Sequence, residues 1–246
     1  MIITSVQNTQ VKNWSKLKMK KCRLKMDLFL IEGEHLLIEA HESDWEIQEI
    51  IVQDGTSVPD YADEYAITTV SDNVFQHITD TRTPQGVAAV VKIKGQIWPC
   101  ANSVLLIDSV QDPGNIGTMI RTADAVGFDA IIIGNDSVDL YNEKVIRSTQ
   151  GSLFHIPIFQ ADLTTAIPSL QKQDFTIWAT TLEQAQSYKD VSIDDKVALL
   201  VGNEGNGVEE TLIDLADCKV KIPILGKAES LNVSVAAGIL MYHIKG

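Results

Sequence analysis

The sequence predicts an α/β protein in which a small α/β domain precedes a larger one built around a parallel sheet. A length of 246 residues is enough for two such domains. From residue 103 onward, short apolar runs alternate with helical stretches, which is typical of a parallel sheet covered by helices on both faces. A stretch with Gly95, Pro99 and several polar residues lies between the two parts and is typical of a linker.

Residues 1–95 are expected to form the small domain. Asn8 is placed to cap a helix in which Val11, Trp14 and Leu17 recur at helical spacing, with lysines on the other faces. The next expected elements are strands at 29–33, 47–52, 66–70 and 86–93 and helices at 35–40 and 72–78. Ser71 is expected to cap the helix at 72–78.

Residues 96–102 are the expected linker, and residues 103–246 the larger domain. Its expected strands lie at 103–110, 129–134, 155–159, 175–181, 197–202 and 218–224. The final segment, 230–242, is apolar almost all round, so we expect a buried helix there.

The composition excludes several classes of protein. A hydrophobic content of 45% with 22% charged residues is that of a globular protein and excludes disordered, collagen-like and coiled-coil chains. No apolar run reaches the roughly 18–20 residues of a membrane-spanning helix, and the N-terminus lacks the order of a secretory signal. Cys22, Cys100 and Cys218 form no CxxC pair, which predicts a reducing, cytoplasmic setting. The histidines show neither the HxxxH nor the HExxH spacing of metal ligands, so we expect no metal site.

The net charge of −13 conceals an asymmetry along the chain. Residues 1–31 contain seven basic residues and one acidic residue, a net charge of +6, which leaves −19 for residues 32–246. The overall acidity argues against a nucleic-acid partner, whereas the basic segment favours contact with a polyanion. A solvated amphipathic helix would explain that segment equally well. Its basic residues are Lys12, Lys16, Lys18, Lys20, Lys21, Arg23 and Lys25.

Three junctions between a strand and the following loop have an unusual composition: 108–127, 197–208 and 221–244. Ligands of parallel α/β sheets bind at the carboxyl ends of the strands, where such loops meet. The second junction, with GNEGNG, lacks both the Lys-Ser/Thr of a phosphate-binding P-loop and the GxGxxG order of a dinucleotide fold. There is also no GxSxG nucleophile motif.

Each junction has a purely structural explanation beside a functional one. Asn115 and Ser230 are plausible helix caps, and Arg121 is a plausible surface residue of an amphipathic helix. The glycines of the second junction are compatible with nothing more than a tight turn.

In this order, however, the three junctions resemble the signature motifs of the SpoU/TrmH family of RNA ribose 2′-O-methyltransferases. The matching stretches are DPGNIGTMIRTADAVG, LLVGNEGNGV and IPILGKAESLNVSVAAGI, and the resemblance covers residues 103–246. The N-terminal stretch, with Gln-Asn, Val-Lys and Phe-Leu-Ile-Glu-Gly, is similar to the ribosomal-protein-like substrate-binding domain of many members.

The resemblance implies a trefoil-knotted methyltransferase domain that binds S-adenosyl-L-methionine. It also implies a homodimer that packs knot against knot, with active sites completed across the interface. The apolar last helix would suit either that interface or the core. The cofactor contacts that it implies, largely through the backbone, lie at Thr180, Gly202, Ile222 and Leu231.

The implied reaction is attack of a ribose 2′-hydroxyl on the sulfonium methyl group. The matching polar positions are Asn115, Arg121, Glu204, Ser230 and Asn232. Because a guanidinium has a pKa above about 12, Arg121 is a poor base. We expect it to bind the phosphate beside the target ribose and to stabilise the developing alkoxide, with the other polar residues orienting Arg121 or the ribose.

Ribosomal RNA is the expected substrate, ahead of transfer RNA, because many members that act on ribosomal RNA have the N-terminal domain. The seven basic residues at positions 12–25 are the expected RNA contacts. A non-catalytic RNA-binding or assembly factor is the alternative from another class, and the complete polar set argues against it. An unrelated nucleotide-binding enzyme is disfavoured by the absent phosphate-loop pattern.

Overall fold

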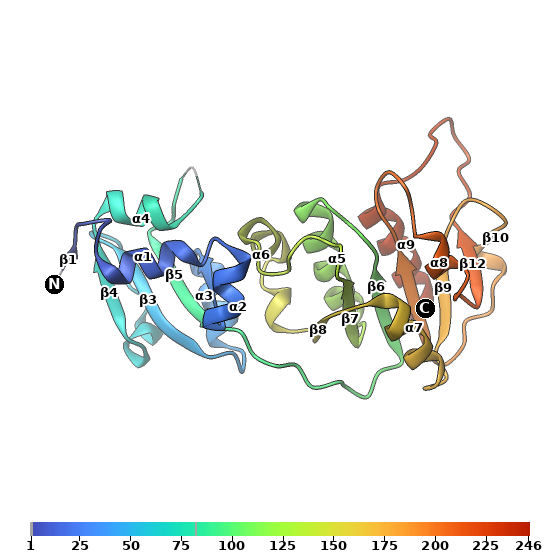
Figure 1. The fold of residues 1–246 in the computed structure, drawn as a ribbon, viewed down its shortest axis with the longest axis horizontal. Coiled ribbons are helices and arrows are strands. Elements are labelled where there is room, and N and C mark those ends of the chain that lie inside the picture. The colour runs from blue at the N-terminus through green and yellow to red at the C-terminus, as the bar shows by residue number, and fades with distance from the viewer. Residues whose placement is uncertain (1, 82) are drawn as a thin grey trace. The chain divides into compact units, whose positions relative to one another are not determined.

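The computed structural model describes residues 2–81 and 83–246, which form two compact units. The first unit comprises the chain up to Gly95 together with Asp139–Phe154, and the second comprises Gln96–Val138 and His155–Gly246. Figure 1 shows the N-terminal elements in blue and the elements from β9 to α9 in orange to red. The domain boundaries predicted at 95/96 and 102/103 remain predictions. Residues 139–154 lie within the predicted larger domain but pack with the first unit.

The first unit contains a mixed sheet with the strand order β1-β4-β3-β5-β2. The parallel strands β1, β4 and β3 lie on one side, and β5 runs antiparallel to both of its neighbours, β3 and β2. The strands are β1 (Ile2–Ile3), β2 (Leu28–Glu32), β3 (Ile47–Gln53), β4 (Ile67–Val70) and β5 (Val87–Lys92). All four expected strands of this unit are therefore present, and β1 was not anticipated.

The helices of the first unit are α1 (Thr9–Lys16), α2 (Lys20–Met26), α3 (Glu34–His41), the 3₁₀ helix η1 (Asp60–Glu64) and α4 (Asp72–Ile78). The predicted cap of α1 is confirmed, because the Asn8 side chain accepts a hydrogen bond from the Gln10 N–H. Ser71 is the N-cap residue of α4, as predicted, but its side chain forms no capping hydrogen bond. Its hydroxyl is directed instead at Asn73 Oδ1, 2.6 Å away, and lies 3.3 Å from the Ile3 carbonyl oxygen.

The segment 139–154 packs into the first unit although it follows strand β7 of the second unit in the chain. It contains α6 (Glu143–Thr149) and the 3₁₀ helix η2 (Ser152–Phe154). The ring of Tyr141 lies 4.7 Å from that of Phe29, and the ring of Phe154 lies 5.5 Å from that of Trp45. Burial and the nearby Asp139 carboxylate raise the pKa of Tyr141 to about 12.

The second unit contains a sheet with the order β10-β12-β9-β11-β6-β7-β8, in which every pair of neighbours is parallel. The predicted parallel α/β architecture is therefore confirmed. The strands are β6 (Ser103–Ile107), β7 (Ala130–Gly134), β8 (Ile158–Ala161), β9 (Thr176–Thr180), β10 (Gln186–Ser187), β11 (Val197–Val201) and β12 (Cys218–Lys221). β8 begins three residues later than expected, and the short β10 was not anticipated.

The helices α5 (Pro113–Val126), α7 (Leu163–Gln171), α8 (Glu210–Ile213) and α9 (Val233–Lys245) cover this sheet, together with the 3₁₀ helix η3 (Tyr188–Asp190). α5 packs against α9, and α7 packs against α8. Strands β6 and β11 are buried along their whole length, which explains their near-continuous apolar sequences.

The expectation that the last helix is buried all round is wrong for one of its faces. Ala237, Leu240 and Met241 are buried, as expected. Val235 and Tyr242, however, are 51% and 58% exposed, and Ile239 is 36% exposed. These three residues recur at the spacing of one helix face, so α9 presents an apolar stripe that this chain leaves uncovered.

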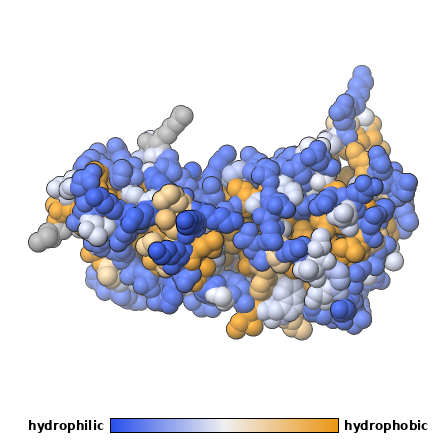
Figure 2. Space-filling view, viewed as in Figure 1, coloured by the Kyte–Doolittle hydropathy of each residue, from blue (hydrophilic) through white to orange (hydrophobic). Residues whose placement is uncertain are grey.

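Within residues 2–81 and 83–246, no helix is long and apolar enough to cross a membrane. Figure 2 shows one face of the protein, where hydrophilic residues predominate and hydrophobic residues gather in smaller areas.

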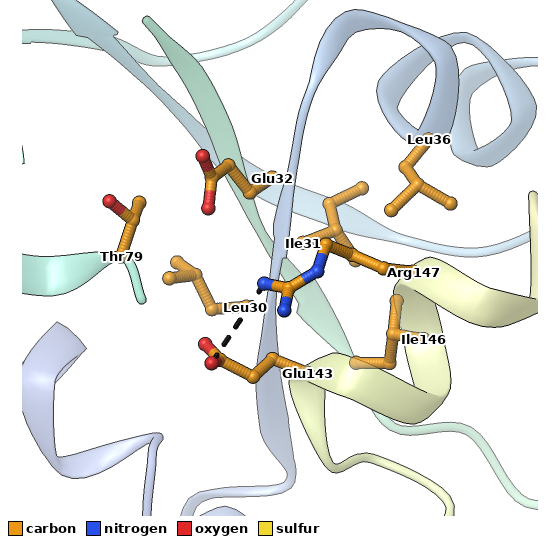
Figure 3. A pocket seen from close by; sticks show the side chains of 8 residues that line it. All are labelled: Leu30, Ile31, Glu32, Leu36, Thr79, Glu143, Ile146 and Arg147. Atoms are coloured by element: carbon orange, nitrogen blue, oxygen red, sulfur yellow. Dashed lines mark ion pairs between the residues drawn. The ribbon is translucent and has the colours of Figure 1, made fainter. Parts of the chain in front are cut away.

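A small cluster of charged groups lies between α6 and strand β2 in the first unit (Figure 3). Arg147 and Glu143 of α6 form an ion pair at 3.9 Å beside Glu32 of β2. The enclosed space, about 10 Å³, holds at most one water molecule, so we do not regard it as a ligand site. Burial, together with a hydrogen bond to Asp80, raises the pKa of Glu143 from 4.5 to about 7.

This cluster makes the stability of the protein dependent on pH. The folded state holds a proton on Glu143 between pH 4.5 and about 7, where the unfolded chain has released it. The contribution of Glu143 is therefore fully present below pH 4.5 and is lost as the pH rises through about 7. We expect Glu143→Gln to reduce the loss of stability between pH 5 and pH 8, measured by urea unfolding at both values.

The matched control is Glu42→Gln, which changes an exposed carboxyl group of the same unit. It should leave the difference between the two pH values as in the parent protein. An equal loss of stability in Glu143→Gln and in the parent would contradict the assignment.

Candidate active site

A tight loop follows strand β11 at the carboxyl edge of the parallel sheet. It closes on itself through two backbone hydrogen bonds between Asn203 and Gly207, of 2.8 and 2.9 Å. A Cβ atom at Gly202 would lie 2.2 Å from the backbone of Gly207 and of Val208, so only glycine fits there. The need for a tight turn therefore explains Gly202, as the structural alternative predicted. This explanation does not say whether the turn also surrounds a ligand.

The loop is fastened to the end of the neighbouring strand β6 on both of its sides. At its start, Asn203 Nδ2 donates to the Ser109 carbonyl at 2.8 Å. At its end, the Glu209 N–H donates to Oδ2 of the buried Asp108 at 2.8 Å. These contacts form because β6 and β11 pair in register up to Ile107 and Val201, so both chains leave the sheet side by side.

A chain of side-chain hydrogen bonds joins the three loops that the sequence analysis singled out. Asn115 Nδ2 donates to Glu204 Oε1 at 2.9 Å, and Asn232 Nδ2 donates to Asn115 Oδ1 at 3.0 Å. Three of the five predicted catalytic residues therefore lie together. Asn115 is not the helix cap, because Asp112 caps α5 by accepting from the Asn115 N–H at 3.0 Å.

Glu204 is held as an anion at neutral pH. Partial burial alone would raise the pKa of its carboxyl group. Hydrogen bonds from Asn115 and from the backbone N–H groups of Gln111 and Asp112 outweigh this effect and lower the pKa below 4.5. A carboxylate that already accepts three hydrogen bonds is suited to fixing its neighbours in place and is a weak proton acceptor.

Asn232, and not Ser230, caps the last helix. Asn232 Oδ1 accepts hydrogen bonds from the N–H of Ser234 at 2.9 Å and from the N–H of Val235 at 3.4 Å. Helix capping therefore does not explain Ser230, which is exposed in the loop before the helix. This loop, between β12 and α9, extends away from the sheet in Figure 1.

A cavity of about 980 Å³ opens beside the glycine loop. All four residues predicted to contact the cofactor line it, together with three of the predicted catalytic residues. These seven residues are Thr180, Gly202, Ile222, Leu231, Glu204, Ser230 and Asn232. The Thr180 hydroxyl already donates to the Leu200 carbonyl at 3.1 Å.

Arg121 lies apart from this cavity. It is an exposed residue of α5, and it forms no hydrogen bond or ion pair with any residue that the structure describes. The structure therefore brings four of the predicted catalytic residues together, with Asn115 contacting Glu204 beside the cavity, and leaves Arg121 outside the group.

The predicted RNA contacts of the first unit are exposed on α1, α2 and the turn between them, with one exception. Lys18 is exposed but forms an ion pair with Asp80 at 2.6 Å. Arg23 is a correction: it is only 5% exposed and its guanidinium is bound to Asp139 and to two backbone carbonyls. It is therefore not available to an RNA phosphate in this structure.

Three residues that the sequence did not single out hold the loops in place: Asp108, Asp112 and Asn203. An aspartate directly before a proline at a helix start is a recognisable capping signal, so Asp112 could have been found. Nothing in the sequence marks Asp108 or Asn203, because their roles depend on the pairing of β6 with β11. Among residues 2–81 and 83–246, no group of three or more His, Cys, Asp or Glu residues is placed to hold a metal ion.

The cavity is large enough for a nucleotide cofactor. Its volume is within the range of about 300–1,000 Å³ typical of small-molecule sites. The backbone of Gly202 lines the cavity, and Ile222 and Leu231 supply apolar parts of its wall. A parallel α/β sheet with a cavity of this size among the loops at the carboxyl ends of its strands is the arrangement typical of α/β enzymes that bind nucleotide cofactors.

Comparison with known proteins identifies the family to which the chain belongs. Residues 102–242 match the SpoU rRNA methylase family, and residues 8–89 match an MRM3-like substrate-binding domain. The chain belongs to the SpoU rRNA methylase family. The predicted class, an RNA 2′-O-methyltransferase that depends on S-adenosyl-L-methionine, is thereby confirmed.

Relatives resemble the whole chain and not only the second unit. The 23S rRNA (guanosine(2553)-2′-O)-methyltransferase RlmP of Bacillus subtilis is 44% identical over 245 residues, which cover 99% of each chain. An rRNA methyltransferase from Sinorhizobium meliloti, solved with AdoMet bound, has a TM-score of 0.89 and 30% identity and covers 100% of this chain and 97% of that one. The SpoU methyltransferase AviRb from Streptomyces viridochromogenes, also with AdoMet, has a TM-score of 0.88 and 25% identity and covers 97% of both chains.

The glycine loop provides a test of the cofactor site. We expect Gly202→Ala to weaken binding of S-adenosyl-L-methionine at least about tenfold in calorimetry, because the new methyl group would overlap loop backbone that cannot move aside cheaply. Gly205→Ala is the matched control, since its Cβ would meet only the Asn203 side chain at an ordinary 3.5 Å. Equal affinities in the two variants would show that the loop does not surround the cofactor.

Proposed function

We propose that this protein methylates the ribose 2′-hydroxyl of a guanosine in 23S ribosomal RNA. The observation that supports this target most strongly is the 44% identity to the Bacillus subtilis enzyme over 99% of both chains. The match of residues 8–89 to a substrate-binding domain supports a role for the first unit in holding the RNA. The protein would act in the cytoplasm, where ribosomal RNA is found in bacteria.

The two units would divide the work. In the first unit, the exposed lysines of α1 and α2 are the candidate contacts for RNA phosphates: Lys12, Lys16, Lys18, Lys20, Lys21 and Lys25. Their ammonium groups attract the backbone of any RNA, so selection of the nucleotide falls to the second unit. The acidity of the rest of the chain would disfavour nonspecific adhesion of RNA elsewhere.

In the second unit, the residues of this chain would chiefly orient the ribose. Bound S-adenosyl-L-methionine supplies an activated methyl group on its sulfonium. Glu204 fixes the Asn115 amide, which in turn receives a hydrogen bond from Asn232, so the three loops keep one arrangement. Ser230 lines the cavity with no hydrogen bond to any residue that the structure describes, and it is therefore free to bind the ribose. Holding the attacking oxygen in line accounts for much of the rate increase in such a displacement.

Arg121 would complete the site of a second copy of the chain. It lies on α5 outside its own cavity, and α5 packs against α9, whose apolar stripe of Val235, Ile239 and Tyr242 is uncovered. A homodimer formed through this stripe, as the family resemblance implies, would bury the apolar side chains and supply the guanidinium from the partner. There it would bind the phosphate next to the target ribose and stabilise the developing alkoxide. The trefoil knot is part of the same proposal.

The target can be tested directly. The protein is incubated with methyl-labelled S-adenosyl-L-methionine and either transcribed 23S ribosomal RNA or transfer RNA, and alkali-resistant linkages are mapped. We expect one labelled linkage in 23S ribosomal RNA, at a guanosine. Label in transfer RNA alone would replace the proposed substrate, and label on a base would overturn ribose methylation.

Supply of Arg121 by the partner can be tested by mixing two impaired variants, assayed at a cofactor concentration low enough to leave the Gly202→Ala cavity largely empty. Arg121→Ala retains a sound cavity, and Gly202→Ala retains a sound Arg121. If the arginine acts across the dimer, half of the randomly mixed dimers contain one complete site, and activity should return to about a quarter of the parent value. If it acts within one chain, the mixture is no more active than the average of the two variants assayed alone.

A further inference from the structure

The sequence placed Arg23 among the RNA contacts, but the structure gives it a different position. Arg23 lies on α2 between exposed lysines, yet its side chain is 6% exposed. Its Nη1 donates to the carbonyls of Leu17 and Lys18 at 2.6 and 2.9 Å, and its Nη2 pairs with the carboxylate of Asp139, which is 14% exposed. A buried guanidinium with three such bonds has a structural task.

The two carbonyls belong to the turn that joins the predicted RNA-binding helices. α1 ends at Lys16 and α2 begins at Lys20, so residues 17–19 set the angle between the helices. By bonding both carbonyls from the following helix, Arg23 fixes this turn. The positions of the lysines before, within and after the turn therefore depend on Arg23.

The third bond ties the same turn to the segment 139–154, which the chain reaches only after strand β7. Asp139 stands at the start of this segment, beside Tyr141, whose ring packs on Phe29 of β2. The ion pair thus has a rigid support on its acidic side. A lysine in place of Arg23 carries its three donors on one nitrogen, whereas the acceptors here are arranged around the two separate nitrogens Nη1 and Nη2 of the planar guanidinium.

We infer that Arg23 and Asp139 form a positioning pair that holds the α1–α2 lysines in the arrangement that binds RNA. This inference rests on the proposed function of the first unit. It assigns to Arg23 no contact with RNA and makes the acidic Asp139 a residue that RNA binding needs.

This inference and simple electrostatics predict opposite changes in RNA affinity when the negative charge of Asp139 is removed. Removing a negative charge near a phosphate-binding surface should strengthen RNA binding if only charge matters. If Asp139 holds Arg23, Asp139→Asn should weaken it, because a neutral amide is a poor partner for a buried guanidinium. We expect the Kd for transcribed 23S ribosomal RNA, measured by filter binding, to rise about tenfold.

The matched control is Asp54→Asn, which removes one exposed acidic charge from the same unit. It should leave the Kd unchanged or lower it slightly. Binding as tight in Asp139→Asn as in Asp54→Asn would overturn the inference.

The salt dependence of binding separates positioning from direct contact. A residue that binds a phosphate lowers the slope of log K against log salt by about one when it is removed. Arg23→Met should weaken binding with the slope unchanged, whereas Lys20→Met should lower the slope.

The double variant Arg23→Met with Asp139→Asn should bind no more weakly than Arg23→Met alone, because both changes remove the same interaction. A lowered slope in Arg23→Met, or additive losses, would contradict the pair.

Two further measurements show whether a negative result contradicts only the inference or also the proposed function. If replacing Lys16, Lys20 and Lys21 together does not change RNA binding, the proposed role of the first unit fails. If those changes weaken binding while Asp139→Asn does not, only the inference fails. Because Asp139→Asn could lower stability, its urea unfolding is measured in parallel, and the Kd is determined below the onset of unfolding.

Discussion

The in-register pairing of β6 with β11 is the constraint on which the rest of the catalytic unit depends. It makes the two central strands end together, at Ile107 and Val201, so that the chain leaves the sheet at two adjacent points. Asp108 and Asn203 can then join the two loops by hydrogen bonds. Without this pairing, Glu204 would not reach the start of α5, and Asn115 would have no fixed partner. The site is thus a consequence of strand register before it is a matter of individual side chains.

Local patterns predicted the elements of the fold well, because burial imposes a period on the sequence. The continuous apolar runs of β6 and β11 indicated a covered parallel sheet, and the glycines around Glu204 indicated a close approach of backbone. Where two explanations had the same pattern, the sequence could not choose between them. Asn115 and Ser230 both looked like helix caps, and only the paths of the loops show that Asp112 and Asn232 have that role.

The sequence also mispredicted the surroundings of residues where segments distant in the chain meet. Arg23 follows four lysines closely and looked like one more cation for RNA, since its partner Asp139 lies 116 residues further on. The last helix looked buried because its apolar residues surround it, yet one chain covers only part of that surface. Both errors have one cause: sequence periodicity does not report the tertiary contacts that set a residue's surroundings.

The placement of segment 139–154 has a consequence for how the protein is made. Ribosomes synthesise the chain from its N-terminus, and Phe29, Trp45 and Arg23 emerge long before their partners Tyr141, Phe154 and Asp139. Until residue 154 has left the exit tunnel, the first unit lacks part of its core and the counter-ion of a buried guanidinium. The N-terminal unit is therefore finished only after the first strands of the catalytic sheet exist. Its maturation is linked to that of the second unit, so an incomplete chain would lack the properly built surface that we propose binds RNA.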